Sequence, residues 1–283
     1  MVAKIKWGMI IVKTLHYRSI WLSDIHLGTK HTNSRFLLDF LKKTRSEYLY
    51  LVGDIIDFWQ LEKGGHWPHI NNHIMRIVLK KVRTGTKVIY IPGNHDEVMR
   101  KFSGSKVRGI EVQAETIHKT AAGLDFLVTH GDEFDRVVQK NKWLAKLGSV
   151  AYDMLLDFNY FYNGVRRKLG LPYKSVSAYL KHKIKKVVNF ISRYEETVVD
   201  EAIKRKVDGF ICGHIHQPAS KNFQGIVYKN VGDWVESCSA LIECFDGSLQ
   251  IVHWRGPETE ERLAWDFAHQ TELLGGEHLA QAG

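Results

Sequence analysis

The sequence has 283 residues, and its hydrophobic content of 44% is enough to form the core of one large domain or two small ones. The formal net charge of +9 predicts attraction to polyanions, anionic lipid surfaces or phosphorylated substrates, and does not choose among them. The three cysteines are odd in number and lie in or beside apolar runs, which indicates buried thiols in a reducing compartment and implies no disulfide framework.

No segment has the features of a signal peptide or of a membrane span. The apolar stretch near Met9 is bracketed by lysines, and no small-residue cleavage site follows it. The most apolar long window, residues 147–165, contains Asp153 and Asp157, and charges near the centre of a spanning helix are costly. We therefore expect a cytoplasmic protein that contacts a membrane only peripherally.

Short apolar runs rich in β-forming residues alternate along the chain with stretches of helical period. The runs typical of strands occupy residues 18–22, 48–52, 87–91, 126–129 and 209–212. The helical faces between them are formed by Phe36, Leu37, Phe40 and Leu41, and by Ile70, Ile74, Ile77 and Val78. This alternation predicts an α/β sandwich built in layers.

The pattern changes after residue 209, where strand-like runs follow one another closely. They occupy residues 226–231, 240–245 and 249–254. The last two are joined by a turn at Asp246 and Gly247, so we expect a second, mostly antiparallel sheet. Residues 134–206 show only helical patterns, and we interpret them as a helical insertion within a single domain spanning 1–283.

Polar side chains that bind metals follow nearly every strand expected in the core. The five segments are Ser23-Asp24-Ile25-His26, Gly53-Asp54-Ile55-Ile56-Asp57, Gly93-Asn94-His95-Asp96, Thr129-His130-Gly131-Asp132 and Gly213-His214-Ile215-His216. Open α/β sheets place their ligand sites at the carboxyl ends of their strands. A lone Asp-x-His or His-x-His is more often packing or surface detail, but five such segments in this arrangement predict a site.

The spacing within these segments assigns ligands. Asp24 and His26 stand two residues apart, so in an extended segment both side chains project to the same side, and His214 and His216 repeat this spacing. Asp54 follows a glycine that can take a positive φ, and its two carboxylate oxygens suit it to bridge two metals.

The donor types indicate which metals such a site would hold. Asn94 offers a carbonyl oxygen and His130 an imidazole nitrogen. Mixed oxygen and nitrogen donors suit Mn²⁺, Fe²⁺, Zn²⁺ or Mg²⁺, and the segments lack the thiolates of structural zinc sites. The composition thus favours catalytic metals. We expect two divalent ions, Mn²⁺ in the first place, with Fe²⁺, Zn²⁺ or Mg²⁺ as alternatives.

The order of the motifs, D-x-H, G-D-x-x-D, G-N-H-[DE], a histidine and G-H-x-H, resembles that of the calcineurin-like metallophosphoesterase superfamily over residues 20–216. The resemblance implies a four-layer αββα sandwich and a dinuclear centre. It assigns the first metal to Asp24, His26, Asp54 and His216, and the second to Asp54, Asn94, His130 and His214.

Such a centre would drive water onto phosphorus, because two cations that share a water lower its pKa and neutralise phosphoryl oxygens. His95, next to Asn94, is expected to face the leaving group as a proton donor or cation. Asp57 is placed to hold the other ring nitrogen of His95. The alternatives are a loop histidine without a role and a simple acid at a helix N-terminus.

Within the superfamily the chain resembles the UDP-2,3-diacylglucosamine pyrophosphatase group of lipid A biosynthesis. The shared features include Ser-Asp-Ile-His-Leu-Gly at 23–28, Val-Gly-Asp-Ile-Ile-Asp-Phe-Trp at 52–59, Gly-His-Ile-His-Gln-Pro at 213–218 and Asn-Val-Gly-Asp-Trp-Val-Glu-Ser at 230–237. This resemblance implies cleavage of a nucleotide-linked diphosphate to UMP and a lipid phosphate. The best-known members carry arginine at the position of His95, whereas His95 follows the general superfamily pattern, whose members also act on other phosphate mono- or diesters.

The expected insertion bears on the substrate class. An aromatic-rich run over residues 152–162 precedes a lysine-rich stretch, which suits an amphiphile whose acyl chains are buried while its phosphates, and an anionic membrane, meet the cations. The alternative is a purely structural cap with a solvated basic face. The candidate substrate contacts are Ser175, Ser177, Lys181 and Lys185, together with Asp132, Asp233 and Glu236 near the strand-end motifs.

Two further functions remain as alternatives. A nuclease or nucleotide phosphodiesterase also fits the basic charge, although the separation of aromatic and basic residues argues against an extended nucleic-acid surface. A non-catalytic scaffold with the same fold is disfavoured, because every expected ligand position is filled.

Overall fold

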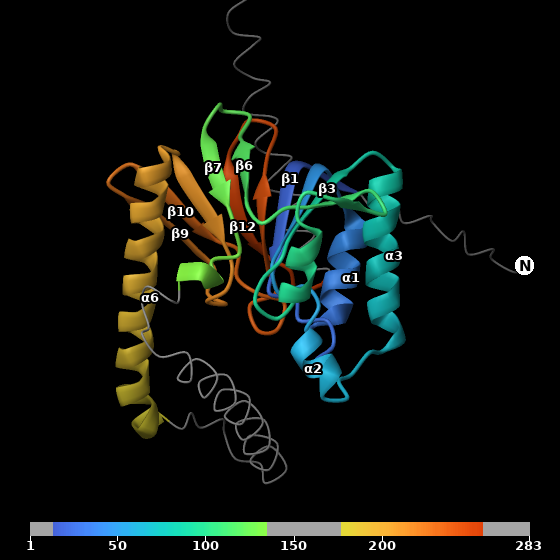
Figure 1. Ribbon diagram of the computed structural model, residues 1–283, viewed down its shortest axis with the longest axis horizontal. Coiled ribbons are helices and arrows are strands. Elements are labelled where there is room, and N and C mark those ends of the chain that lie inside the picture. Colours follow the sequence, from blue (N-terminus) through green and yellow to red (C-terminus); the bar gives the residue numbers. More distant parts are fainter. Residues whose placement is uncertain (1–13, 135–176, 257–283) are drawn as a thin grey trace, which may run out of the picture. The chain divides into compact units, whose positions relative to one another are not determined.

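The structure is a computed structural model that describes residues 14–134 and 177–256, with side chains described over 14–134 and 190–256. Contacts within the chain divide it into a first unit, residues 1–130 and 207–283, and a second unit, residues 131–206 (Figure 1). The strand-end motifs up to His130 and from Gly213 onward all lie in the first unit.

The first unit contains a mixed seven-stranded sheet in the order β12-β11-β1-β2-β3-β5-β4. Its strands are β1 (Leu15–Ser23), β2 (Thr44–Val52), β3 (Lys87–Ile91), β4 (Lys106–Val107), β5 (Ile110–Val112), β11 (Ser239–Glu243) and β12 (Leu249–His253). Strands β1, β2, β3 and β5 are parallel neighbours, so their carboxyl ends meet at one edge of the sheet.

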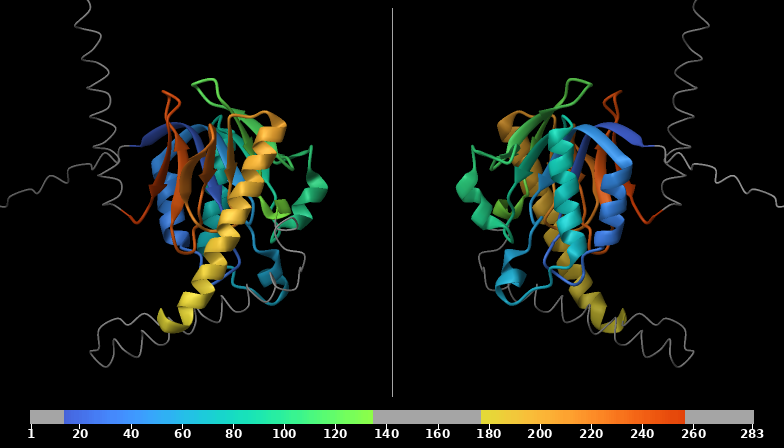
Figure 2. Two further views of the ribbon diagram at one scale, coloured as in Figure 1. Left: turned by 90° about the vertical axis from the view of Figure 1, so that its left-hand side faces the viewer. Right: turned by 90° about the vertical axis from the view of Figure 1, so that its right-hand side faces the viewer.

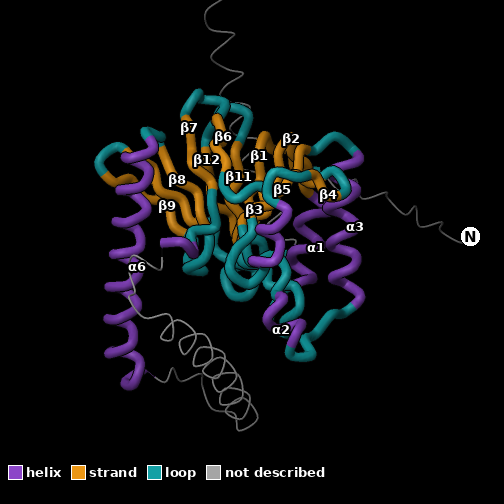
Figure 3. The backbone as a smooth tube through the Cα atoms, in the orientation of Figure 1, coloured by secondary structure: helices purple, strands orange, loops and turns teal. Residues whose placement is uncertain are grey.

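A second mixed sheet, of five strands, has the order β6-β7-β8-β10-β9. Its strands are β6 (Thr116–Lys119), β7 (Asp125–Val128), β8 (Gly209–Cys212), β9 (Ala219–Phe223) and β10 (Ile226–Asn230). Strands β7, β8 and β10 run parallel, and the outer strands β6 and β9 pair antiparallel. The loops that follow the parallel strands of both sheets gather at one edge (Figure 3).

Helices α1 (Ser34–Lys43) and α3 (His69–Arg83) cover the outer face of the seven-stranded sheet (Figures 1 and 2). The alternation along β1 explains the layers, since successive side chains of a strand point to opposite faces. Ile20 and Leu22 belong to the core under the helices, whereas Trp21 belongs to the core between the sheets. That second core also contains Tyr50, Ile89, Phe126 and Ile211.

The α/β class, the two sheets and the expected core strands are confirmed, but the prediction for the C-terminal strands was wrong. These strands do not form a separate antiparallel sheet. Strands β11 and β12 extend the first sheet, where Ser19 of β1 faces Glu243 of β11, while β10 lies in the second sheet, half of whose pairings are parallel. Apolar periodicity predicts a strand but not the strand with which it pairs. Here the pairing of β1 with β11 joins residues more than 200 positions apart, so no local pattern could indicate it.

Strands β4, β5, β6 and β9 were not predicted. Their sequences are KV, IEV, TIHK and ASKNF, too short or too polar to give a strand pattern. The short helices α2 (Phe58–Glu62) and η1 (Glu97–Phe102), which follow the second and third motifs, were also missed.

The second unit contains η2 (Asp132–Phe134) and the long helix α6 (Ser177–Arg205), and the expected insertion at 134–206 falls within this unit. The rings of Phe134 and Tyr194 lie 6.4 Å apart, so η2 packs against α6. The aromatic run at 152–162 lies outside the described residues. Among the described helices, none combines the length and the apolar character needed to cross a membrane.

Candidate metal centre

The strand-end motifs of the first unit converge at the edge where the parallel strands of both sheets end. Asp24 directly follows β1, Asp54 and Asn94 follow β2 and β3, and His130 and His214 follow β7 and β8. The two sheets therefore bring together side chains that are distant in sequence, such as His26 and His216, which lie 190 residues apart.

The backbone at these positions differs from the extended segments expected. Asp24 and His26 have φ values of 49° and 52°, and His214 and His216 have φ values of 70° and 54°. Asp54 is also left-handed, with a φ of 54°. For residues other than glycine this conformation costs roughly 1–2 kcal/mol each and marks functional positions when the surrounding structure holds it. Here the amide of His26 donates to the carbonyl of Asp54 at 2.8 Å.

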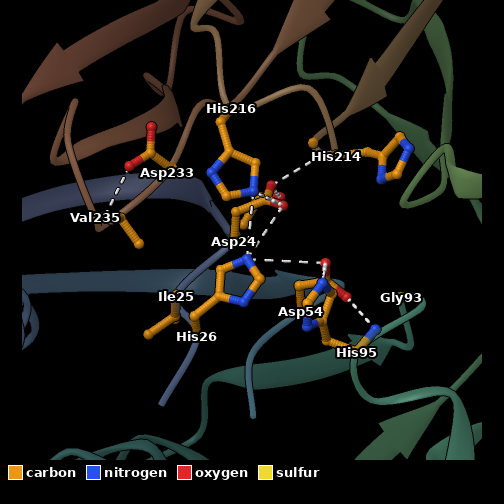
Figure 4. A network of polar contacts seen from close by, with 12 residues as sticks. Asp24, Ile25, His26, Asp54, Gly93, His95, His214, His216, Asp233 and Val235 are labelled. Atoms are coloured by element: carbon orange, nitrogen blue, oxygen red, sulfur yellow. Dashed lines mark hydrogen bonds and ion pairs between the residues drawn. The ribbon is translucent and has the colours of Figure 1, made fainter. Parts of the chain in front are cut away.

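Asp24, His26 and His216 form the first cluster (Figure 4). Oδ1 of Asp24 lies 3.2 Å from Nε2 of His216 and 4.0 Å from Nε2 of His26. The two Nε2 atoms are 3.3 Å apart, so two nitrogen donors and one carboxylate oxygen converge. Oδ2 of Asp24 accepts hydrogen bonds from the hydroxyl of Ser23 and, at 2.9 Å, from the amide of His214.

Asp54 lies at the centre of a second set of side chains. Its Oδ2 atom is 3.4 Å from Nε2 of His130, 3.9 Å from Nε2 of His26 and 4.0 Å from Nε2 of His95. Its Oδ1 atom accepts the backbone N–H of His95 at 2.8 Å. The Asp54 carboxylate thus faces donors of the first cluster as well as of this second set, since His26 belongs to both.

Two motif glycines make this convergence possible because side chains of the site lie directly against their Cα atoms. A Cβ atom on Gly93 would overlap the carboxylate of Asp54 and the ring of His130. A Cβ atom on Gly213 would overlap Ser23 and the carboxylate of Asp24. Both positions therefore require glycine.

The remaining two expected ligands lie beside these clusters. Oδ1 of Asn94 is buried and makes no hydrogen bond with the described residues, which is unusual for a buried amide oxygen. The ring of His214 lies 5.2 Å from the ring of His130 and points away from the Asp24 carboxylate (Figure 4). Oxygen and nitrogen donors converging in a buried site, with the Asn94 oxygen lacking a hydrogen bond, fit divalent cations.

The electrostatics of the site keep its carboxylates ionised. Burial favours the neutral form of Asp24, but the neighbouring His216 outweighs it and lowers the pKa of Asp24 to about 2. Burial likewise opposes ionisation of Asp54, yet His130, His26 and His95 hold its pKa well below the ordinary value. Burial lowers the pKa of His216, but Asp24 raises it to a net value of about 9. Such concentrated acid and imidazole charge is typical of sites that bind cations.

The model of the calcineurin-like phosphoesterase family matches residues 17–218, which covers all five motif segments. The chain belongs to this family. Family members are phosphoester or pyrophosphate hydrolases that use divalent metals, so this chain is a metal-dependent hydrolase with phosphorylated substrates.

The chain is also similar to individual family members. It is 24% identical over 237 residues to a UDP-2,3-diacylglucosamine hydrolase of Shewanella sp. (strain MR-7), covering 81% of this chain and 95% of that one. The corresponding hydrolase of Blochmanniella pennsylvanica is 25% identical over 211 residues, covering 71% and 79%. Among solved structures, Vacuolar Protein Sorting 29 from Cryptosporidium parvum aligns with a TM-score of 0.43 at 12% identity, covering 84% and 91%.

Asp57 and His95 form a pair next to the side chains of the candidate metal centre. Oδ2 of Asp57 lies 3.0 Å from Nδ1 of His95 and 3.0 Å from Nδ1 of His26. Asp57 also caps α2, where its Oδ1 atom accepts the amide of Gln60 at 2.8 Å. The indole of Trp59 lies 4.2 Å from the ring of His95. A role for Asp57 in orienting the ring of His95 requires such contacts. The role itself stays a prediction.

His95 is grouped with His26 and Asp54 by distance, so geometry alone would also allow its ring to bind a cation. Burial lowers the pKa of His95, but the contact of its ring with the Asp57 carboxylate and the charge of Asp54 raise this pKa above the ordinary value overall. A raised pKa suits a proton donor, but the expected metal ligand His216 also has a raised pKa, so this shift alone does not distinguish a donor from a ligand.

Sequence reasoning missed the role of Asp96. Its fully buried carboxylate accepts the amides of Gly93 at 2.6 Å and Ile55 at 2.8 Å, and the hydroxyl of Tyr90. It thereby ties the loop that carries Asn94 and His95 to the loop that carries Asp54. Burial and the charge of Asp54 raise the pKa of Asp96. The sequence signal for this role was the acidic residue at the fourth position of the Gly93-Asn94-His95-Asp96 segment.

The expected substrate contacts are only partly placed by the structure. Asp233 is buried and accepts the amides of Val235 at 2.7 Å and Glu236 at 2.5 Å, so its described contacts organise a turn, while Glu236 is exposed. Asp132 begins η2 in the second unit. Ser177, Lys181 and Lys185 lie on α6, but their side chains, like the whole of Ser175, lie outside the described residues.

Proposed function

We propose that the chain hydrolyses the diphosphate of UDP-2,3-diacylglucosamine, or of a related lipid-linked nucleotide, to UMP and a lipid phosphate. The observation that carries the hydrolytic chemistry is the convergence of Asp24, His26, Asp54, His130 and His216. The substrate is supported by the named hydrolases, which resemble most of this chain at about a quarter identity.

In this proposal the centre holds two divalent cations, with Mn²⁺ as the preferred metal. Asp24, His26, Asp54 and His216 would hold the first, and Asp54, Asn94, His130 and His214 the second. When bound, the two ions supply a water of lowered pKa as nucleophile and neutralise the phosphoryl oxygens.

The residues of the chain then divide the remaining work. His95 donates its Nε2 proton to the leaving oxygen, and Asp57 keeps the ring in that orientation through Nδ1, at a separation of 3.0 Å. Trp59 lies against the same ring and restricts its rotation. Asp96 holds the two loops that carry these groups, so the donor and the metal ligands keep their relative positions.

The second unit supplies the lipid specificity in this proposal. Its aromatic-rich stretch and the lysines of α6 would receive acyl chains and phosphates, and would hold the protein at an anionic membrane surface in the cytoplasm. The net charge of +9 favours such a surface.

A phosphodiesterase acting on nucleotides or nucleic acid is the second candidate. The observation in its favour is His95, which stands where the best-known diacylglucosamine pyrophosphatases carry arginine and which restores the general superfamily motif.

The experiment that separates these candidates is a substrate profile of protein reconstituted with Mn²⁺, Fe²⁺, Zn²⁺ or Mg²⁺. UDP-2,3-diacylglucosamine, an aryl phosphate diester and single-stranded DNA would be compared as substrates. We expect the lipid nucleotide to be cleaved with the highest kcat/KM. Preferential cleavage of the diester or of DNA would overturn the lipid assignment. Activity that is present with metal and absent from the metal-free protein would support the metal centre.

A further inference from the structure

A basic cleft lies at the opposite end of the seven-stranded sheet from the metal centre. It has a volume of about 520 Å³ and is formed by the first residues of β1 and β2 and by the C-terminal ends of α1 and α3. Strand β1 runs from this cleft to Asp24 over nine residues, so the two sites are separated by roughly 30 Å. The cleft therefore belongs to neither the clusters nor the loops of the centre.

The charges that line this basic cleft are unbalanced. Among the described residues of its lining, Lys42, Arg45, Lys80 and Lys81 contribute four cations, and Glu47 contributes the single acid. Within the described part of the chain, none of these five side chains forms an ion pair. The ends of α1 and α3 add about −0.5 charge each, which leaves a net charge of about +2 in the cleft.

Lys81 is the least ordinary of these groups, because its side chain is buried, with 7% exposed. Its ammonium donates to the carbonyl of Thr44, which caps α1, and no carboxylate of the described residues neutralises it. Burial and the nearby Arg45 lower its pKa to about 8. Capping a helix end explains one lysine here, but not a buried ammonium beside three further cations.

The wall of the basic cleft also contains apolar surface. Phe245 is 54% exposed at the turn between β11 and β12, and Tyr17 and Leu41 lie deeper in the lining. A concave site of this volume suits a small molecule, whereas an anionic membrane or a nucleic acid would meet a flatter and more extended surface.

We propose that this basic cleft is a second ligand site that binds a small phosphorylated molecule, with the phosphate among Lys42, Arg45, Lys80 and Lys81 and the organic part against Phe245. Cations from three elements then gain a counter-charge that the described residues do not provide. The proposal is independent of the reaction at the metal centre, because no residue of one site belongs to the other.

The test is a titration of the metal-loaded protein with inorganic pyrophosphate and with a nucleoside monophosphate, followed by amide NMR shifts at Gly85 and Thr86 in the cleft. We expect saturable shifts there, separate from any shifts near Asp54. Lys80→Glu should weaken this binding by about tenfold, as expected for one reversed charge near an anion. Arg83→Glu is the matched control, since Arg83 is exposed on the same helix and does not line the cleft.

Three results would overturn the proposal. The first is the absence of saturable shifts at Gly85 and Thr86 for both probes. The second is an equal loss of affinity in Lys80→Glu and Arg83→Glu, which would indicate a general effect of net charge. The third is binding of anionic vesicles that depends on Lys80 without any binding of the two small probes.

Discussion

Oδ2 of Asp57 lies 3.0 Å from Nδ1 of His95, and the same oxygen lies 3.0 Å from Nδ1 of His26. One carboxylate thus orients both the proposed proton donor and a proposed metal ligand. The proximity of the two rings, 4.7 Å between centroids at 86°, follows from sharing this partner.

Replacing Asp57 by alanine should therefore damage two functions at once. Because both imidazoles lose their orienting partner, we expect metal affinity to fall by about 10- to 100-fold, together with a loss of turnover at saturating metal. Metal titrations monitored by calorimetry and by activity would check both effects. Unchanged metal affinity in Asp57→Ala would show that the contact with His26 has no part in binding.

Replacing His95 by alanine should slow turnover while leaving the metals in place. We expect a loss of about 10²- to 10⁴-fold, the usual contribution of general acid catalysis. The loss should be larger for alkyl than for aryl leaving groups, because aryl groups depart without a proton. Metal analysis of His95→Ala and rates with both substrate types provide the measurement. An equal loss for both would reject proton donation and leave an electrostatic role.

Stability at low pH should depend on Glu243, far from the metal centre. Burial opposes its ionisation, but hydrogen bonds from His118, Ser19 and the amide of Ala121 lower its pKa to about 2 from an ordinary 4.5. A lowered pKa in the folded state stabilises the protein above about pH 4.5, and the effect is lost as the pH falls from 4.5 toward 2.

The isosteric variant Glu243→Gln tests this dependence, because it cannot titrate. At pH 6 we expect it to be less stable than the parent by on the order of 2–3 kcal/mol in urea unfolding. The difference should shrink by pH 3, with both proteins free of metal. A difference that does not change with pH would mean that Glu243 contributes only through packing.

The sequence predicted the residues of the candidate site better than their geometry. Asp24, Asp54 and His214 were found because each follows a buried apolar strand, where parallel sheets collect functional side chains. Their left-handed backbone was not predicted, since aspartate and histidine in a sequence indicate a positive φ much less strongly than glycine does. Asp96 was missed because it binds backbone amides, whereas metal-ligand spacing reveals only ligands.

Long-range partners were the least predictable part of the fold. The pairing of Ser19 with Glu243 decides that β11 extends the first sheet, and no local pattern records it. The basic cleft escaped sequence reasoning for the same reason, since Lys42, Arg45 and Lys81 come from three separate elements.

Charge reversal of Lys181 and Lys185 tests the lipid assignment. If α6 binds an anionic lipid substrate or membrane surface, the double glutamate variant should raise KM for the lipid nucleotide in a salt-dependent way. Hydrolysis of a water-soluble diester should hardly change. Kinetics at low and high salt with both substrates would decide the matter, and equal effects on both would indicate a merely structural helix.

The dinuclear centre itself depends most directly on Asp54, whose carboxylate faces His130, His26 and His95. Asp54→Asn keeps the size of the side chain but removes the charge that would be shared between two cations. A suitable control is Asp125→Asn, because among the described residues the side chain of Asp125 pairs only with the exposed Lys119, at 3.4 Å.

The decisive measurement is the metal content per chain of Asp54→Asn, determined by elemental analysis alongside its phosphoesterase activity. We predict fewer than two bound metals and no measurable hydrolysis, with the parent and Asp125→Asn each retaining two metals and full activity. Two metals and full activity in Asp54→Asn would contradict the assignment of this carboxylate as the shared ligand.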